Sequence, residues 1–135
     1  MNADRAPGGG SRYLLDTAEH TAAVYGGDVT RTLLFTTGIL PGQHVVRAAM
    51  AWMEPGKGGQ RHHHPHTDEH YYILDGVADV VIDGVPHRLR PDAFIRVPRG
   101  STHSMANGGE QTLRYLAYHV ADLAFTGEVE HVEDR

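Results

Sequence analysis

The chain has 135 residues, 40% of them hydrophobic and 21% charged, and this length suits one domain with a single core. The formal charge is −5 and the sequence has no cluster of lysine and arginine, so it offers no positively charged surface for a nucleic-acid backbone. No apolar run approaches the roughly 20 residues of a membrane span, and the first residues lack the pattern of a secretory signal. The absence of cysteine excludes disulfides, thiolate nucleophiles and cysteine-based metal sites. We therefore expect a cytoplasmic protein.

Short β-prone segments separated by turn residues follow one another along most of the chain. Residues 1–11, rich in glycine and proline, are expected to form a flexible arm, and Asp16–Val24 is the one weak candidate for a helix. Asp83-Gly84 is a hairpin signal of type I′. Residues 122–135 are expected to form a solvated acidic tail. The β-prone segments are Val29–Phe35, Val45–Met53, Tyr71–Leu74, Val77–Ile82, Ala93–Val97 and Thr112–Val120. Residues 12–121 are thus expected to fold as an all-β sandwich or barrel.

Histidine is unusually frequent, with 11 in the chain. The densest group is internal and interrupted by other residues, so it is not an expression tag. In an extended segment, alternation places His62 and His64 on one face and His63 on the other. Glu69 shares a face with Tyr71, and His103 follows a tight turn at Pro98-Arg99-Gly100. Three imidazoles and one carboxylate suit a divalent transition metal, which in six-coordination would keep about two positions open.

The spacing of these residues resembles the two signature motifs of the cupins. The second motif is matched from its proline onward, but Asp92 stands where the family usually has a glycine. A shifted register that pairs His64 with His66 puts His70 where the glutamate belongs, and it leaves no closing glycine. We therefore prefer the first register. The first motif is matched by Gly56, His62, His64, Glu69 and Gly76, and the second by Pro98, Gly100, His103 and Asn107.

The resemblance implies a single cupin barrel, which is a double-stranded β-helix or jelly roll. It also implies a homodimer that exchanges an N-terminal strand, here Val29–Phe35 or the segment before it. No organic cofactor is expected. In metal-binding cupins the matching positions hold one divalent ion, which would be Fe, Mn, Ni or Zn. Those positions are His62, His64, Glu69 and His103.

Tyr71, His66 and His119 are tentative catalytic residues. Tyr71 shares the face of Glu69 and is a candidate proton donor, although a core tyrosine with a satisfied hydroxyl is an equal alternative. His66 lines the mouth, supports a ligand or is simply solvated, and His119 points into the barrel if its strand is central. The remaining histidines are expected outside the cavity, namely His20, His44, His63, His70, His87 and His131. The arginines that could hold a substrate carboxylate, if they face inward, are Arg47, Arg96 and Arg114.

The resemblance implies a metal-dependent enzyme that acts on a small molecule. The favoured activity is a dioxygenase acting on a small enolisable or aromatic substrate. The first alternative is a non-redox isomerase, lyase or cyclase in which Zn, Mn or Ni acts as a Lewis acid. The second alternative is a cupin that binds a metal and a small ligand without catalysis.

Overall fold

The computed structural model describes residues 23–25, 29–36, 44–122, 125 and 127–134. The expected flexible arm, residues 1–11, lies outside the described residues. The expected helix lies mostly outside them as well. Its last residues, however, belong to the strand Ala23–Tyr25, so the helix prediction is wrong there. Within the described part of the chain, no helix has the length and apolar character that crossing a membrane requires.

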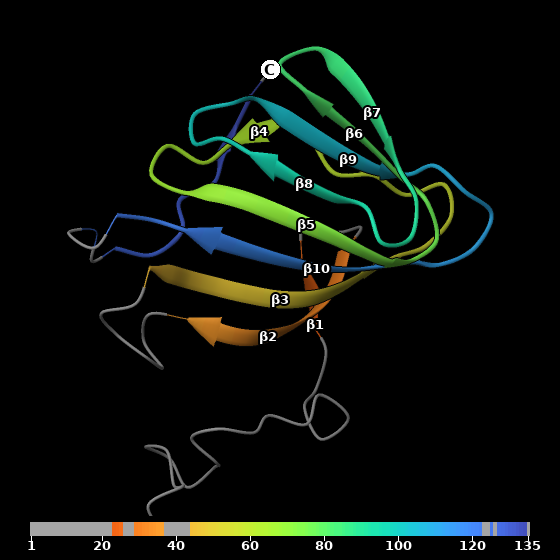
Figure 1. Ribbon diagram of the computed structural model, residues 1–135, viewed down its shortest axis with the longest axis horizontal. Helices are drawn as coiled ribbons and strands as arrows, with labels where there is room; N and C mark the ends of the chain where they lie inside the picture. The colour runs from red at the N-terminus through yellow and green to blue at the C-terminus, as the bar shows by residue number, and fades with distance from the viewer. Residues whose placement is uncertain (1–22, 26–28, 37–43, 123–124, 126, 135) are drawn as a thin grey trace, which may run out of the picture.

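The described strands form two antiparallel sheets that face each other (Figure 1). The six-stranded sheet has the order β1 (Ala23–Tyr25), β2 (Val29–Thr36), β3 (Val45–Met53), β10 (Leu113–Val120), β5 (Asp68–Asp75) and β8 (Phe94–Val97). The five-stranded sheet has the order β11 (Val132–Glu133), β4 (His62–His63), β9 (His103–Asn107), β6 (Ala78–Ile82) and β7 (Val85–Leu89). The expected all-β barrel is confirmed.

Alternation along the central strands decides which side chains face the interior. In β10 the burial alternates strictly, so Tyr115 and His119 point inward while Arg114 and Tyr118 point outward. The expected exchange of the segment Val29–Phe35 between two chains stays a prediction, and within this chain β2 pairs with β3.

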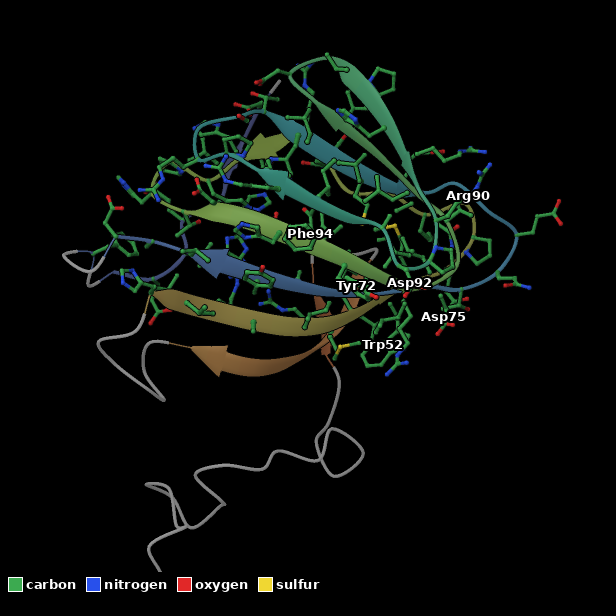
Figure 2. The ribbon with its side chains drawn as sticks, in the orientation of Figure 1. Trp52, Tyr72, Asp75, Arg90, Asp92 and Phe94 are labelled. Atoms are coloured by element: carbon green, nitrogen blue, oxygen red, sulfur yellow. The ribbon has the colours of Figure 1, made fainter. Side chains whose placement is uncertain are left out.

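Two turns require backbone conformations that few residues adopt. Asp83 and Gly84 have φ angles of 47° and 82°, which agrees with the expected type I′ turn. Asp92 has a φ of 72°, a left-handed conformation that explains why a glycine is usual at this motif position. Aspartate tolerates this conformation better than most residues, and the Tyr72 hydroxyl donates to its Oδ1 at 2.6 Å (Figure 2).

The C-terminal segment is part of the fold, which corrects the expectation of a solvated tail. Val132 and Glu133 pair with His63 and His62, so β11 is an edge strand of the five-stranded sheet. The Asp134 carboxylate accepts hydrogen bonds from His63 Nδ1 and from the Thr102 hydroxyl, each at 3.0 Å. Acidic composition alone did not reveal this pairing, because the partner strand is distant in the sequence.

A comparison of Gly76 with Gly84 distinguishes the backbone strain of a side chain at positive φ from a clash with neighbouring atoms. Both residues are left-handed, but a Cβ at Gly76 would lie 2.9 Å from the Thr112 carbonyl oxygen, whereas a Cβ at Gly84 meets nothing within 4 Å. We expect Gly84→Ala to lower the free energy of unfolding by about 1 kcal/mol and Gly76→Ala by about 3 kcal/mol. Urea denaturation of both variants measures the difference, and equal losses would contradict the role of the Thr112 contact.

Candidate metal centre and its cavity

Four side chains from separate strands and a loop converge at one end of the barrel. His62 lies on β4 directly opposite His103 on β9, Glu69 lies on β5, and His64 follows β4. One ligand atom from each of these residues lies within 4.8 Å of the others, a grouping that could hold a metal ion. Three of the four are buried, and His62 is partly exposed. The structure thus brings together the four residues that the sequence motifs singled out.

Each of the three histidines is oriented by a hydrogen bond at its Nδ1 atom. His62 Nδ1 lies 2.8 Å from the Gln60 carbonyl oxygen, His64 Nδ1 lies 2.7 Å from that of Glu130, and His103 Nδ1 lies 3.0 Å from that of Ser101. A carbonyl oxygen only accepts, so each Nδ1 carries a proton and donates it. An imidazole that donates through Nδ1 can offer its Nε2 lone pair to a metal ion, which is how ligand histidines are held in metal proteins. The donor set therefore fits a divalent transition metal.

The Glu69 carboxylate is the electrostatic centre of the site. Its Oε1 accepts from the Tyr71 hydroxyl at 2.6 Å and lies 3.0 Å from His103 Nε2. Its Oε2 lies 2.8 Å from His119 Nε2. Burial acts to raise the pKa of Glu69, but the neighbouring histidines, with His119 first, hold that pKa well below its usual value. Glu69 is therefore ionised inside the barrel.

The surrounding groups respond to burial and to the charge of Glu69. Burial, opposed by the hydrogen bond to Gln60, lowers the pKa of His62 to about 4, so this imidazole is neutral at pH 7. Burial and the Glu69 charge raise the pKa of Tyr71 well above its usual value. Burial also raises the pKa of Tyr115. Both phenols therefore stay protonated at neutral pH.

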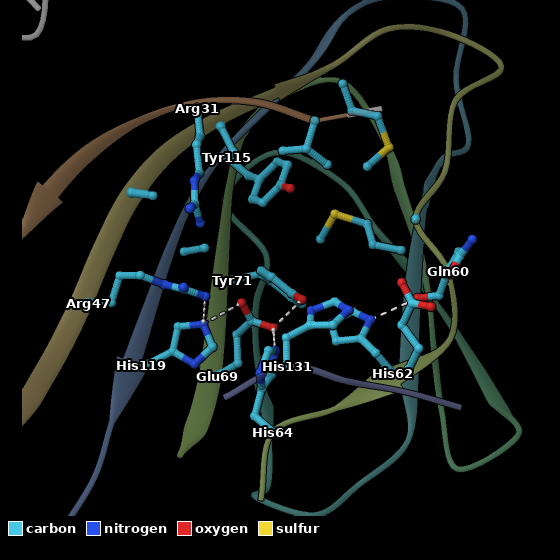
Figure 3. A pocket seen from close by; sticks show the side chains of 18 residues that line it. Arg31, Arg47, Gln60, His62, His64, Glu69, Tyr71, Tyr115, His119 and His131 are labelled. Atoms are coloured by element: carbon cyan, nitrogen blue, oxygen red, sulfur yellow. Dashed lines mark hydrogen bonds and ion pairs between the residues drawn. The ribbon is translucent and has the colours of Figure 1, made fainter. Parts of the chain in front are cut away.

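A cavity of about 370 Å³ opens beside this cluster (Figure 3). That volume lies in the range of roughly 300–1,000 Å³ typical of sites for small organic ligands. The polar residues lining it beyond the cluster are Arg31, Arg47, Gln60, Tyr71, Tyr115, His119, His131 and Glu133. An apolar wall is formed by Val29, Ala49, Ala51, Met53, Met105 and Ala117.

The structure brings two of the three catalytic candidates to the cavity. Tyr71 and His119 line it, and His119 Nδ1 lies 3.0 Å from the Thr67 hydroxyl oxygen. His66 is exposed and is not among the lining residues. Its Nε2 lies 3.5 Å from the Glu130 carboxylate, and its ring stacks on Phe125. The break in alternation at Pro65 explains why strand parity did not settle the position of His66.

His131 and Glu133 were missed as cavity residues. His131 was expected at the surface. It is exposed, yet it lines the cavity and stacks on His62 with ring centroids 4.1 Å apart. Glu133 lines the same side, and the preceding Glu130 supplies the carbonyl that orients His64. The one available signal was the spacing of two residues between His131 and Glu133, which places them on the same face of a strand.

Comparison with known proteins agrees with the fold. The "Cupin domain" family model matches residues 50–119. Protein SchB of Streptomyces halstedii is 32% identical over 108 residues, covering 80% of this chain and 75% of that protein. Dimethylsulfoniopropionate lyase DddW of Ruegeria pomeroyi is 36% identical over 106 residues, covering 78% of this chain and 66% of that protein.

Solved structures share the architecture at lower sequence identity. The polyketide cyclase RemF from Streptomyces resistomycificus superposes with a TM-score of 0.72 at 20% identity, covering 90% of this chain and 84% of that one. A predicted oxalate decarboxylase from Thermotoga maritima gives a TM-score of 0.74 at 21% identity, covering 81% of this chain and 99% of that one. The family match, the relatives and the shared barrel lead to one conclusion: this chain belongs to the cupin domain family.

Proposed function

We propose that this protein is a metal-dependent, non-oxidative cyclase that closes a ring in a small polyketide-like substrate. The observation that carries the proposal is the convergence of three oriented imidazoles and one ionised carboxylate beside a cavity with an apolar wall. Curated relatives carry names such as "Polyketide synthase CurC" of Streptomyces cyaneus, which supports a substrate of this class.

The ligand set suits Zn, Mn or Ni as a Lewis acid. His62, His64 and His103 would hold the ion through Nε2, and Glu69 would hold it through a carboxylate oxygen. A bound ion would make the hydrogen atoms next to a substrate carbonyl more acidic. Ring closure then needs a base, a proton donor and a surface that folds the substrate onto itself.

The chain's own residues can serve these three needs. In the reaction, a carbon next to one carbonyl loses a proton to a base and attacks a second carbonyl. His119 in the cavity wall is the candidate base through Nδ1, the nitrogen that faces the Thr67 hydroxyl and not Glu69, and the protonated Tyr71 is the candidate donor to the oxygen of the attacked carbonyl. The new carbon–carbon bond closes the ring, and loss of water from the resulting alcohol then introduces a double bond. The apolar wall would pack against the body of the folded substrate.

A lyase is the second candidate, favoured by the 36% identity to dimethylsulfoniopropionate lyase. An elimination of that kind can begin with the same step, removal of a proton next to a carboxyl group. The cavity of about 370 Å³ is large for so small a substrate, which is why we place the cyclase first. The expectation of a dioxygenase stays a prediction, with no support from the names of the relatives.

Metal binding is expected to depend on the cluster and not on the neighbouring surplus histidine. After purification without a metal-affinity tag, we expect about one divalent ion per chain by elemental analysis. His62→Ala and His103→Ala should lose it, because each removes an oriented Nε2 ligand. His66→Ala, the matched control from the shifted register, should keep it. Metal retained in the first two variants and lost in the third would contradict the assignment.

The C-terminal strand is expected to support metal binding without supplying a ligand. A chain ending at residue 127 lacks the Glu130 carbonyl that orients His64 and the His131 ring stacked on His62. Loss of such supporting contacts typically weakens metal affinity 10-fold to 100-fold. Competition with a fluorescent zinc chelator measures the change, and thermal unfolding shows whether the shortened chain still folds. An unchanged affinity would contradict the supporting role.

Activity is tested with metal-loaded protein and a panel of aromatic poly-β-ketones, under nitrogen and in air. We expect dehydrated ring products without oxygen consumption. Tyr71→Phe should be slower by about 100-fold, whereas Tyr72→Phe on the outer face of the same strand should match the parent. Product formation that requires oxygen would favour the dioxygenase instead. Acrylate released from dimethylsulfoniopropionate would favour the lyase.

A further inference from the structure

Two arginines extend into the cavity from neighbouring strands of the six-stranded sheet. Arg31 lies on β2 and Arg47 on β3, and Figure 3 shows both guanidinium groups reaching inward. The sequence had offered Arg47, Arg96 and Arg114 as holders of a carboxylate. Only Arg47 of these three lines the cavity, because Arg96 and Arg114 lie on the outer faces of their strands.

Inside the barrel, the Arg47 guanidinium contacts an imidazole nitrogen that is poorly suited to accept a hydrogen bond from it. Its Nη2 lies 3.2 Å from His119 Nε2, and the same Nε2 lies 2.8 Å from Glu69 Oε2. A single imidazole nitrogen either carries a hydrogen or offers a lone pair. When His119 Nε2 donates to the ionised Glu69, it has no lone pair left for the Arg47 guanidinium.

Arg47 also differs from the ion-paired arginines on the outside of the barrel. No carboxylate of the described residues lies within ion-pair distance of Arg47. The outer arginines with an aspartate partner are Arg88, Arg96, Arg99 and Arg114. Arg47 is partly buried, and its guanidinium carries five donors in a planar fork. An anionic ligand in the cavity would supply the acceptors that Arg47 does not find in the described residues.

We propose that Arg47, assisted by Arg31 on the adjacent strand, forms a carboxylate-binding subsite in the wall of the cavity. A planar carboxylate matches the guanidinium fork in two parallel hydrogen bonds. The apolar wall on the same cavity accepts the body of an aromatic or extended molecule. The ligand is therefore a free organic acid and not a neutral ester, amide or thioester. As a statement about the substrate, this rests on the proposed function.

Two arginines and two carboxylates line the cavity, namely Arg31, Arg47, Glu69 and Glu133, so their formal charges balance. Glu69 is committed to the histidine cluster, and Glu133 lies on β11 at the edge of the five-stranded sheet. A divalent ion held by the cluster would make the interior more positive, and the approach of an anion correspondingly more favourable.

The test uses two probes of the same shape, naphthalene-1-carboxylate and naphthalene-1-carboxamide. Their binding is measured by isothermal titration calorimetry with the metal-free and the zinc-loaded full chain. The parent protein should bind the acid more tightly than the amide in both forms. In Arg47→Gln the acid should weaken by about 10-fold to 100-fold while the amide is unchanged. Arg47→Lys should recover part of the loss, and Arg114→Gln, on the outer face of β10, should match the parent.

Equal binding of acid and amide to the parent would overturn the subsite. An acid preference that survives Arg47→Gln and disappears in the metal-free protein would also overturn it, because the carboxylate would then be bound by the metal. Zinc content and thermal unfolding of Arg47→Gln show that a loss of binding is not a loss of fold. If the acid binds through Arg47 but no ring product forms, the proposed function fails while the subsite stands.

Discussion

Burial of one ionised carboxylate is the constraint on which the rest of the barrel depends. Glu69 is buried, and an isolated buried carboxylate would be unstable or would take up a proton. Here polar groups approach from several sides: the Tyr71 hydroxyl donates to Oε1, Nε2 of His103 and of His64 lie beside Oε1, and Nε2 of His119 lies beside Oε2. Supplying them requires β4, β5, β9 and β10 to meet at one end of the barrel. The two sheets therefore converge where the side chains that stabilise the buried Glu69 carboxylate have to meet.

The two oxygens of Glu69 have different neighbours, and this difference organises the site. Oε1 faces His64 and His103, which belong to the metal-binding cluster. Oε2 faces His119, whose other nitrogen lies at hydrogen-bond distance from the hydroxyl of Thr67. The contact between Oε2 and His119 thus orients the carboxylate, and Oε1 remains directed at His64 and His103. Packing of this kind fixes a side-chain position more firmly than a single contact does.

The sequence predicted those parts of the site that depend on local rules. Alternation along a strand places His62 and His64 together, as found, and it left open whether His119 points inward, which the structure shows it does. Spacing around tight turns placed His103 within reach. The same rules failed for His131, because β11 is two residues long and pairs with a strand far earlier in the chain. A pairing so short and so non-local leaves only the two-residue spacing of His131 and Glu133 as a signal.

Strand alternation can predict the face on which Arg47 lies, but the chemical role of this side chain depends on the residues around it. The sequence allowed an inward arginine, but whether that arginine binds a ligand depends on its partners. An inward arginine facing an aspartate would be structural, as Arg99 is with Asp68 on the outside. Beside Arg47 stands His119, whose Nε2 is already directed at Glu69. Because low polarity strengthens every charge interaction, an unmatched guanidinium in a partly apolar cavity selects strongly among ligands. The discrimination between an acid and its neutral analogue then follows from the barrel itself.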